Sequence, residues 1–384
     1  MHTPITHQTT LTSVKENIHL DEWSASHTDL PLDTDAQWSI KKHTLHGGKQ
    51  EGVDMIELDN GAMRITIIPT RGMSIYDVSY GGLRLGWNSP VKEIVHPQFI
   101  DMEDNGGLGW LEGFNEWMTR CGVEFAGHPG EDNGRLLTLH GKIGNIPTSE
   151  VQVVIDKEPP HRIRIRGKVH EVFFNGPNLE LWTEVSTVPG SNSFRIDDVL
   201  TNKGKLEQEF MIIYHANFGP PLLEQGSKLL GTIEKLQPFD AHAASEVQRW
   251  DTYHQAKDGF AEQVYCIYPS ADSDGNAHFL LHNASADQAV SFTYPKEQLP
   301  YLTQWKNENT GGYVTGLEPG TGFPHNRSIE RKYGRVPVLK PGASRSFGLE
   351  YTIHKDKEEV KAAANAIQNL MQQPPQVIAE VIGK

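Results

Sequence analysis

The stretch HRIRIRGKVHEV, residues His161 to Val172, alternates apolar and basic side chains with a period of two. Successive side chains of a β-strand point to opposite faces, so this alternation indicates a strand with one buried and one solvated face. Similar runs, separated by Gly, Pro, Asn and Asp, lie on both sides of it: MRITIIPT (63–70), VQVVID (151–156), LELWTEVSTV (179–188), FRIDDVLTN (194–202) and FMIIYHANF (210–218). Many short strands with turn signals between them predict a mainly all-β chain that folds as a large antiparallel β-sandwich.

One long helix is expected near the C-terminus, in KDKEEVKAAANAIQNLMQQ (355–373). Asp356 with Glu359 resembles a capping box, and Pro374 with Pro375 ends the helical pattern. One face collects the apolar side chains Val360, Ala363, Ala364, Ile367, Leu370 and Met371. An amphipathic helix of this kind is expected to cover a face or an edge of a sheet.

Three regions are expected along the chain. Residues 1–45 form an N-terminal extension that packs on the sandwich, 46–354 form the sandwich domain, and 355–384 form the C-terminal helix and tail. Within the sandwich, residues 81–135 are rich in Gly and Trp and are interpreted as a long ordered excursion from the sheets. Such excursions often form lids or site walls.

The charge balance and the cysteines limit the class of protein. The chain has 49 acidic and 35 basic residues and a formal net charge of -14, which argues against a nucleic-acid footprint or an anionic-membrane surface. Cys121 and Cys266 show no CxxC spacing, which predicts neither a disulfide framework nor a thiolate metal site. A reduced, cytoplasmic chain without a signal peptide or membrane span is the simplest interpretation.

Four segments place a titratable side chain beside Gly, Pro or Asn at the end of a probable strand. They are IPTRGMSIYDV with Arg71, LLTLHGKIGN with His140, MIIYHANFG with His215, and GLEPGTGFPHNR (316–327) with Glu318. The last segment holds three glycines and two prolines and is expected to be neither helix nor regular strand. Two strand-end histidines and a loop carboxylate can act as acid and base if their surroundings push their pKa values apart.

The order of these segments resembles the galactose mutarotase (aldose 1-epimerase) superfamily, and most closely its aldose 1-epimerase-like branch. The resemblance covers roughly residues 50 to 354. It rests on His140-Gly141, on Thr201-Asn202 followed by His215-Ala216-Asn217-Phe218, on Gly316-Leu317-Glu318, and on the closing LKPGASRSFGLEYTI (339–353).

This resemblance implies a supersandwich fold and an isomerase that interconverts sugar anomers. Glu318 would remove the proton of the anomeric hydroxyl, and His215 would donate a proton to the ring oxygen. His140 would hydrogen-bond the ring oxygen or a neighbouring hydroxyl. Neither a metal nor an organic cofactor is implied. The expected partner is a small-molecule sugar or sugar derivative, with or without an anionic group, and a homodimer is left open.

Further substrate contacts are expected from side chains near these segments. Arg71 offers a planar set of donors for hydroxyls or an anionic substituent, with a surface Arg as the alternative. Trp305 can stack on the apolar face of a sugar ring, with a core Trp as the alternative. The remaining candidates for hydroxyl contacts are Asn217, Asn307, Glu124 and Arg327.

Two other functions fit the same residues. In a metal-dependent sugar isomerase, a divalent ion would be held by Glu124, His140, His215 and Glu318. In a non-catalytic carbohydrate-binding module, the sandwich would bind sugar without an acid and base pair, because a fold does not determine its function.

Overall fold

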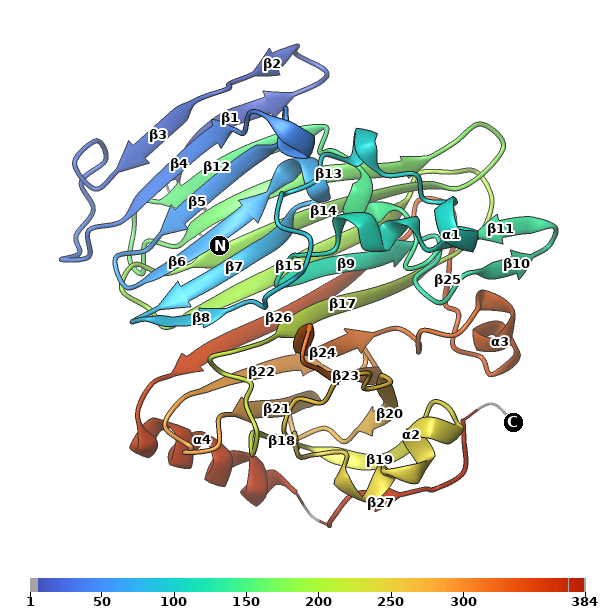
Figure 1. Ribbon diagram of the computed structural model, residues 1–384. Helices are drawn as coiled ribbons and strands as arrows, with labels where there is room; N and C mark the ends of the chain where they lie inside the picture. Colours follow the sequence, from blue (N-terminus) through green and yellow to red (C-terminus); the bar gives the residue numbers. More distant parts are fainter. Residues whose placement is uncertain (1–5, 372, 383–384) are drawn as a thin grey trace.

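The computed structural model describes residues 6–371 and 373–382, which are organised around two large β-sheets that form a sandwich (Figure 1). The first sheet has ten strands, in the order β18 (Lys228–Gly231), β21 (Asn276–His282), β22 (Ala289–Pro295), β26 (Ser344–His354), β15 (Ser193–Asn202), β14 (Asn178–Thr187), β13 (Ile163–Val172), β12 (Glu150–Asp156), β1 (Thr6–Ser13) and β2 (Ile18–His19). Its neighbouring strands are antiparallel, as the sequence predicts.

The second sheet has thirteen strands. Their order is β27 (Gln376–Val377), β19 (Ile233–Pro238), β20 (Gln263–Pro269), β23 (Tyr301–Asn309), β24 (Gly312–Gly320), β17 (Met211–Phe218), β9 (Met118–Val123), β7 (Ser74–Tyr80), β6 (Met63–Ile68), β5 (Asp54–Asp59), β4 (Ser39–Thr44) and β3 (Trp23–Ser26), with β8 (Leu83–Leu85) paired to β7. The β19–β27 pair is parallel. The N-terminal residues contribute strands to both sheets, because β1 joins β12 while β3 and β4 extend the second sheet beyond β5.

The alternation in residues 161–172 is confirmed by β13. Ile163, Ile165 and Val169 are buried in the core between the sheets, whereas Arg164 and Lys168 on the outer face form ion pairs with acidic side chains of the same sheet. Burying each such aliphatic side chain contributes about 1.5–3 kcal/mol. The period-two pattern therefore decides which face of this strand meets the other sheet.

A buried ion pair joins the two sheets. Arg120 on β9 donates to both carboxylate oxygens of Asp198 on β15, over 2.5 and 3.0 Å, and Tyr214 on β17 donates its hydroxyl to the same carboxylate over 2.8 Å. Removing one partner of such a pair typically costs ~3–5 kcal/mol. The pair therefore fastens β9 and β17, the middle of the second sheet, to the first sheet.

The predicted C-terminal helix is α4 (Lys357–Leu370). The Asp356 carboxylate accepts hydrogen bonds from two backbone N–H groups of its first turn, so the predicted N-cap is confirmed. Val360 and Ile367 pack against Leu280 of β21, and the helix lies along β18 and β21 (Figure 1). The expectation that this helix covers part of a sheet is confirmed. None of the helices within residues 6–371 and 373–382 is long and apolar enough to span a membrane.

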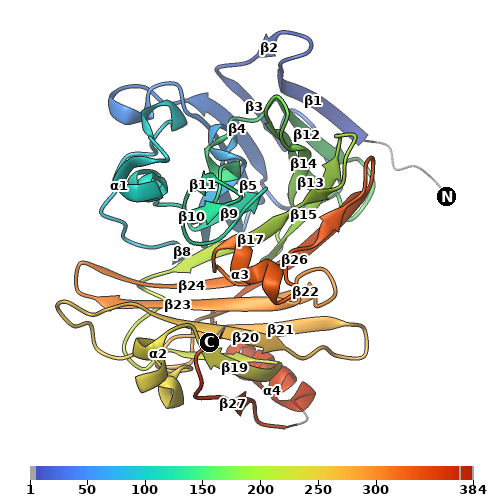
Figure 2. The same ribbon diagram turned by 90° about the vertical axis from the view of Figure 1, so that its right-hand side faces the viewer.

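Residues 81–135 leave the sheets only in part. The expectation of one continuous excursion is wrong for β9 (Met118–Val123), whose six residues are all buried and pair with β17 and β7. Glycines on both sides of this short strand, and tryptophans before it, hide it in the sequence. The region also contributes β8 to the second sheet, whereas α1 (Asp104–Gly107), β10 (Gly130–Asp132) and the start of β11 (Arg135–Leu137) gather on one side of the molecule (Figure 2).

The segment 316–327 also differs from its prediction. Residues 316–320 complete the central strand β24, so the expectation that Glu318 lies outside regular structure is wrong. Pro319 lacks an N–H group, yet the ladder to β17 continues past it to Gly320. Irregular backbone occupies only 321–326, before α3 (Arg327–Lys332) begins. The shorter elements are α2 (Ala241–Ser245), β16 (Gln208–Glu209) and β25 (Val338–Leu339).

Candidate active site

A row of polar side chains crosses four neighbouring strands of the second sheet. Thr119 on β9 pairs with His215 on β17, and Glu318 on β24 pairs with Thr303 on β23. The register of β17 and β24, with Ala216 opposite Leu317, places His215 opposite Glu318. Residues directly opposite each other point to the same face of a sheet. The ladder therefore brings together two groups that are far apart in the sequence.

His215 and Glu318 are in contact but are not aligned for a hydrogen bond. Glu318 Oε1 lies 3.2 Å from His215 Nε2, and the two side chains are 2% and 5% exposed. Among the residues that the structure describes, neither Glu318 Oε1 nor His215 Nδ1 has a hydrogen-bond partner. An unsatisfied buried polar atom costs ~1–3 kcal/mol, so hydrogen bonds to these two atoms would stabilise the site.

Aromatic rings surround His215. The centroids of Trp110, Phe114, Trp305 and His140 lie 6.0, 5.3, 5.8 and 5.2 Å from the centroid of the His215 ring. Burial in this setting, and next the nearby His140 ring, hold the pKa of His215 well below its usual value. His215 is therefore neutral in the free protein at neutral pH.

The pKa of Glu318 is shifted in the opposite direction. Burial raises the pKa of Glu318 well above its usual value, and the negative charge of Glu262 raises it further. Burial therefore disfavours the charged form of both groups, the Glu318 carboxylate and the His215 imidazolium. A buried pair that shares one proton has an acid at one end and a base at the other.

His140 is held in a fixed orientation. Its backbone has a left-handed φ of 58°, which is uncommon for a residue other than glycine, and its backbone N–H and C=O are bound to Gly127 and Gly122. Its Nδ1 lies 3.0 Å from the carbonyl oxygen of Ala126 and must donate to it. Burial lowers the pKa of His140 to about 4, so Nε2 carries a lone pair. That lone pair suits a sugar hydroxyl, whereas a ring oxygen has no proton to offer it.

A cavity of about 270 Å³ opens beside these three residues. Its volume lies just below the ~300–1,000 Å³ typical of pockets for drug-sized ligands, and suits a small molecule. The lining residues are Leu108, Trp110, Leu111, Phe114, His128, Pro129, Leu139, His140, His215, Glu262, Val264, Thr303, Trp305, Glu318 and Pro324. Several of them come from residues 81–135, so this region forms part of the cavity wall, and its role as the wall of a functional site stays a prediction.

Arg71 lies outside this lining. Its side chain is 1% exposed and is engaged in the protein interior, where Nε donates to Glu116 over 2.9 Å, one terminal nitrogen to Asn145 over 2.6 Å and the other to the Gly113 carbonyl over 3.0 Å. A surface position is therefore excluded. These contacts make Arg71 a tie between the strand end and the region around Gly113.

The two predicted asparagines also lie outside the lining of the cavity. Asn217 is fully buried, and its amide donates to the carbonyl oxygens of Glu116 and His215. Asn307 accepts a hydrogen bond from the backbone N–H of Asn309 at the end of β23. Of the six side chains predicted as further substrate contacts, only Trp305 lines the cavity, and it is partly exposed.

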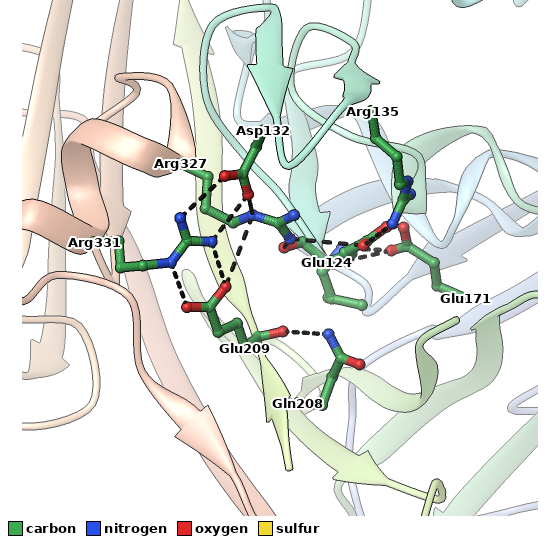
Figure 3. A network of polar contacts seen from close by, with 9 residues as sticks. Glu124, Asp132, Arg135, Glu171, Gln208, Glu209, Arg327 and Arg331 are labelled. Carbon is green, nitrogen blue, oxygen red and sulfur yellow. Dashed lines mark hydrogen bonds and ion pairs between the residues drawn. The ribbon is translucent and has the colours of Figure 1, made fainter. Parts of the chain in front are cut away.

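Glu124 and Arg327 belong to a separate ionic network (Figure 3). Arg327 donates to Asp132 over 2.7 Å, and Arg135 binds both oxygens of Glu124 over 2.8 and 3.1 Å. Hydrogen bonds from Arg331 and then from Arg327 lower the pKa of Asp132 to about 2. This network ties α3 to the β10–β11 hairpin and leaves Glu124 paired away from Glu318. Residues 6–371 and 373–382 contain no group of three or more His, Cys, Asp or Glu side chains placed to hold a metal.

Several lining residues escape the sequence-based reasoning. Trp110, Phe114 and His128 lie in the Trp-rich region, where composition marks a wall without identifying its members. Thr303 is marked only by its register with Glu318. Glu262 carries no sequence signal at all, because an acidic residue just before a strand is common on any surface.

Comparison with known proteins places this chain in a family. Residues 50–353 match the family described as a domain of unknown function, DUF4432. A crystal structure of a proposed aldose 1-epimerase from Klebsiella pneumoniae subsp. pneumoniae has a TM-score of 0.96 and 42% identity, covering 99% of this chain and 100% of that one. No curated protein matches the chain in sequence.

Two more distant structures share the fold. A galactose mutarotase-like protein from Clostridium acetobutylicum has a TM-score of 0.55 at 14% identity, covering 82% of this chain and 98% of that one. A galactose 1-epimerase from Lactobacillus acidophilus has a TM-score of 0.52 at 11% identity, covering 83% and 99%. The chain thus belongs to the DUF4432 family and, with it, to the galactose mutarotase (aldose 1-epimerase) superfamily, in the aldose 1-epimerase-like branch.

Proposed function

We propose that this protein binds a sugar in the cavity beside His215 and Glu318 and interconverts its anomers by acid and base catalysis. The observation that carries the proposal is the contact of 3.2 Å between Glu318 and His215 in the lining of one cavity, where each side chain has a polar atom with no hydrogen-bond partner in the described part of the chain. The similarity to aldose 1-epimerase-like proteins supports the same chemistry.

The reaction needs one proton removed and one proton delivered at neighbouring oxygens. Glu318 takes the proton of the anomeric hydroxyl, and His215 gives a proton to the ring oxygen. The bond between the anomeric carbon and the ring oxygen breaks, and a free aldehyde forms. Rotation about the adjacent carbon–carbon bond, followed by the reverse proton transfers, closes the ring as the other anomer. Each positioned proton transfer contributes ~10²- to 10⁴-fold.

The protonation state that burial favours in the free pair is the one that the pair has while the sugar ring is open. Once the ring is open, Glu318 holds the proton and His215 is neutral, which is the state that burial favours for both groups. The closed sugar needs the other arrangement, with a Glu318 carboxylate and a His215 imidazolium. Transfer of the proton from Glu318 to His215 on sugar binding supplies it. Burial of both groups therefore stabilises the open-chain intermediate relative to the starting complex.

Two further side chains position the sugar. His140 accepts a hydrogen bond from a sugar hydroxyl through Nε2, and Trp305 packs against an apolar face of the ring. We also propose a cytoplasmic location, since Cys121 and Cys266 are both free and buried.

The test is an anomer-exchange NMR screen over neutral, phosphorylated, uronate and sulfonated aldoses. The wild-type protein should accelerate exchange of at least one sugar, and the double variant Glu318→Gln, His215→Ala should not. If no sugar exchanges faster with the wild type than with the double variant, the proposed function is wrong. If the wild type and the Glu318→Gln variant bind sugar equally well and neither accelerates anomer exchange, the result favours a non-catalytic binding module instead.

A further inference from the structure

The cavity beside Glu318 offers no positive charge at neutral pH. Of its lining residues within the described part of the chain, none is Lys or Arg. Its three histidines are all neutral, because burial lowers the pKa of His128, lowers that of His140 to about 4, and lowers that of His215 well below its usual value. A phosphate, carboxylate or sulfonate group entering this cavity would meet no cationic side chain.

Glu262 adds a negative charge at the edge of the cavity. It is exposed, it lies one residue before β20, and its Oε2 accepts a hydrogen bond from Trp305 Nε1 over 2.8 Å. This bond fixes the carboxylate beside the indole ring and leaves Oε1 free. After burial, the charge of Glu262 is the next cause that raises the pKa of Glu318.

The pair formed by Glu262 and Trp305 favours a positively charged ligand over a negatively charged one. A carboxylate beside an aromatic ring attracts an ammonium group through the ion pair and through the ring face, and it repels an anion. Charge selection of this kind works by penalising the wrong ligand as well as favouring the right one.

We propose that Glu262 and Trp305 form a charge filter at the cavity, which admits uncharged and ammonium-bearing aldoses and rejects aldoses that carry a phosphate, carboxylate or sulfonate. This inference rests on the proposed function and narrows its substrate class. Glu262 is a specificity residue in this scheme and takes no part in the proton transfers.

Binding is the direct measurement, because it can be read apart from turnover. Two matched series are titrated: glucose, glucosamine, glucuronate and glucose 6-phosphate, and the four galactose counterparts. Quenching of the fluorescence of Trp110 and Trp305 reports occupancy, with calorimetry as a check. The wild type should bind the anionic members at least about 10-fold more weakly than the neutral parent, and the amino sugars at least as tightly as the parent.

The variant Glu262→Gln isolates the charge. Glutamine keeps an oxygen that can accept the Trp305 N–H, so the ring stays in place while the charge is lost. The penalty against anionic sugars is the ratio of their Kd to the Kd of the neutral parent. In Glu262→Gln this ratio should fall by about 3-fold or more, and added salt should lower it in the wild type as well. Glu234→Gln, an exposed carboxylate on β19 outside the cavity lining, should leave the penalty unchanged.

The outcomes separate the filter from the proposed function. If the wild type binds neutral sugars and discriminates against anions but exchanges no anomer, the filter stands and the proposed function is wrong. If anomers exchange while anionic sugars bind as tightly as their parents, or if Glu262→Gln leaves the penalty unchanged, the filter is wrong. If no member of either series binds, the filter is also wrong.

Discussion

The Glu318 carboxylate occupies the space that a side chain at Gly316 would need. The two residues lie on the same face of β24, and a β-carbon built at position 316 would stand 2.3 Å from Glu318 Oε1 and 3.2 Å from His215 Cε1. Glycine in the interior of a strand often marks a close approach by another group. The Gly-Leu-Glu sequence is therefore a steric requirement of the candidate pair.

Gly316→Ala should reduce turnover by about 100-fold, because a misplacement of about 1 Å at a catalytic group has effects of that size. The free energy of unfolding should fall by only about 1–3 kcal/mol, as for other overpacked sites. Gly312→Ala is the matched control, since it lies on the same strand and its β-carbon would meet no atom within 4 Å. Steady-state anomer exchange and urea unfolding check both effects. Wild-type turnover in Gly316→Ala would show that the carboxylate does not need this space.

Glu318→Gln should abolish anomer exchange and also stabilise the fold. Burial raises the pKa of Glu318 in the folded state, so the stability linked to this group is fully present below its unfolded pKa and is lost as pH rises towards the folded pKa. Glutamine removes that loss, and the free energy of unfolding at neutral pH should rise by about 1 kcal/mol. Denaturant unfolding of both proteins at acidic and neutral pH is the measurement, and the gain should shrink at acidic pH. A gain that is equal at both values would show that the ionisation of Glu318 is not its source.

The activity should be almost independent of pH through the neutral range and should fall in acid. The pair must hold one proton, and the lowered pKa of His215 and the raised pKa of Glu318 move the two limits of that state apart. His140 sets a further acidic limit, because it loses its free lone pair as the pH falls towards its pKa of about 4. A profile of kcat/KM against pH checks this, with circular dichroism to confirm that the protein stays folded. A sharp acidic limb near the usual histidine value of ~6.5 would contradict the lowered pKa values.

Arg71→Ala should lower stability much more than substrate affinity. The change leaves Glu116 buried without its partner, which typically costs ~3–5 kcal/mol. The double variant Arg71→Met, Glu116→Leu removes both charges and should recover most of this loss. Arg64→Ala on the exposed face of β6 is the control for loss of an arginine. Normal unfolding together with a raised KM in Arg71→Ala would show that Arg71 contacts the substrate instead.

Most of the fold was predicted from sequence patterns that span only a few residues. The alternation in β13 and the N-cap of α4 depend on side chains only a few residues apart, and both appear as expected. The strand β9 was missed because its six residues stand between long glycine-rich and tryptophan-rich runs. The strand character of 316–320 was missed because Gly and Pro, which usually interrupt strands, are here enclosed by β17 and β23.

The candidate site depends on register, which the sequence does not display. His215, His140 and Glu318 were identified because each lies close to Gly, Pro or Asn in a segment that resembles a known superfamily. Arg71 and Arg327 carry the same chemical signals, yet their donors are directed to Glu116 and Asp132. Tertiary pairing alone separates an arginine that binds a ligand from one that holds loops together. Glu262 became visible only once Trp305 was seen to donate to it.

The His215–Glu318 pair and much of the cavity wall come from different segments of the chain, which has a consequence for the evolution of such a protein. The proton-transfer pair stands on β17 and β24, two central strands that the Arg120–Asp198 pair helps to fix, whereas much of the cavity wall comes from residues 81–135. Mutations in the wall can alter which molecule fits without moving the reacting groups. Under the proposed function, changes in the parts of 81–135 that flank β9 could direct the same proton transfers to new molecules.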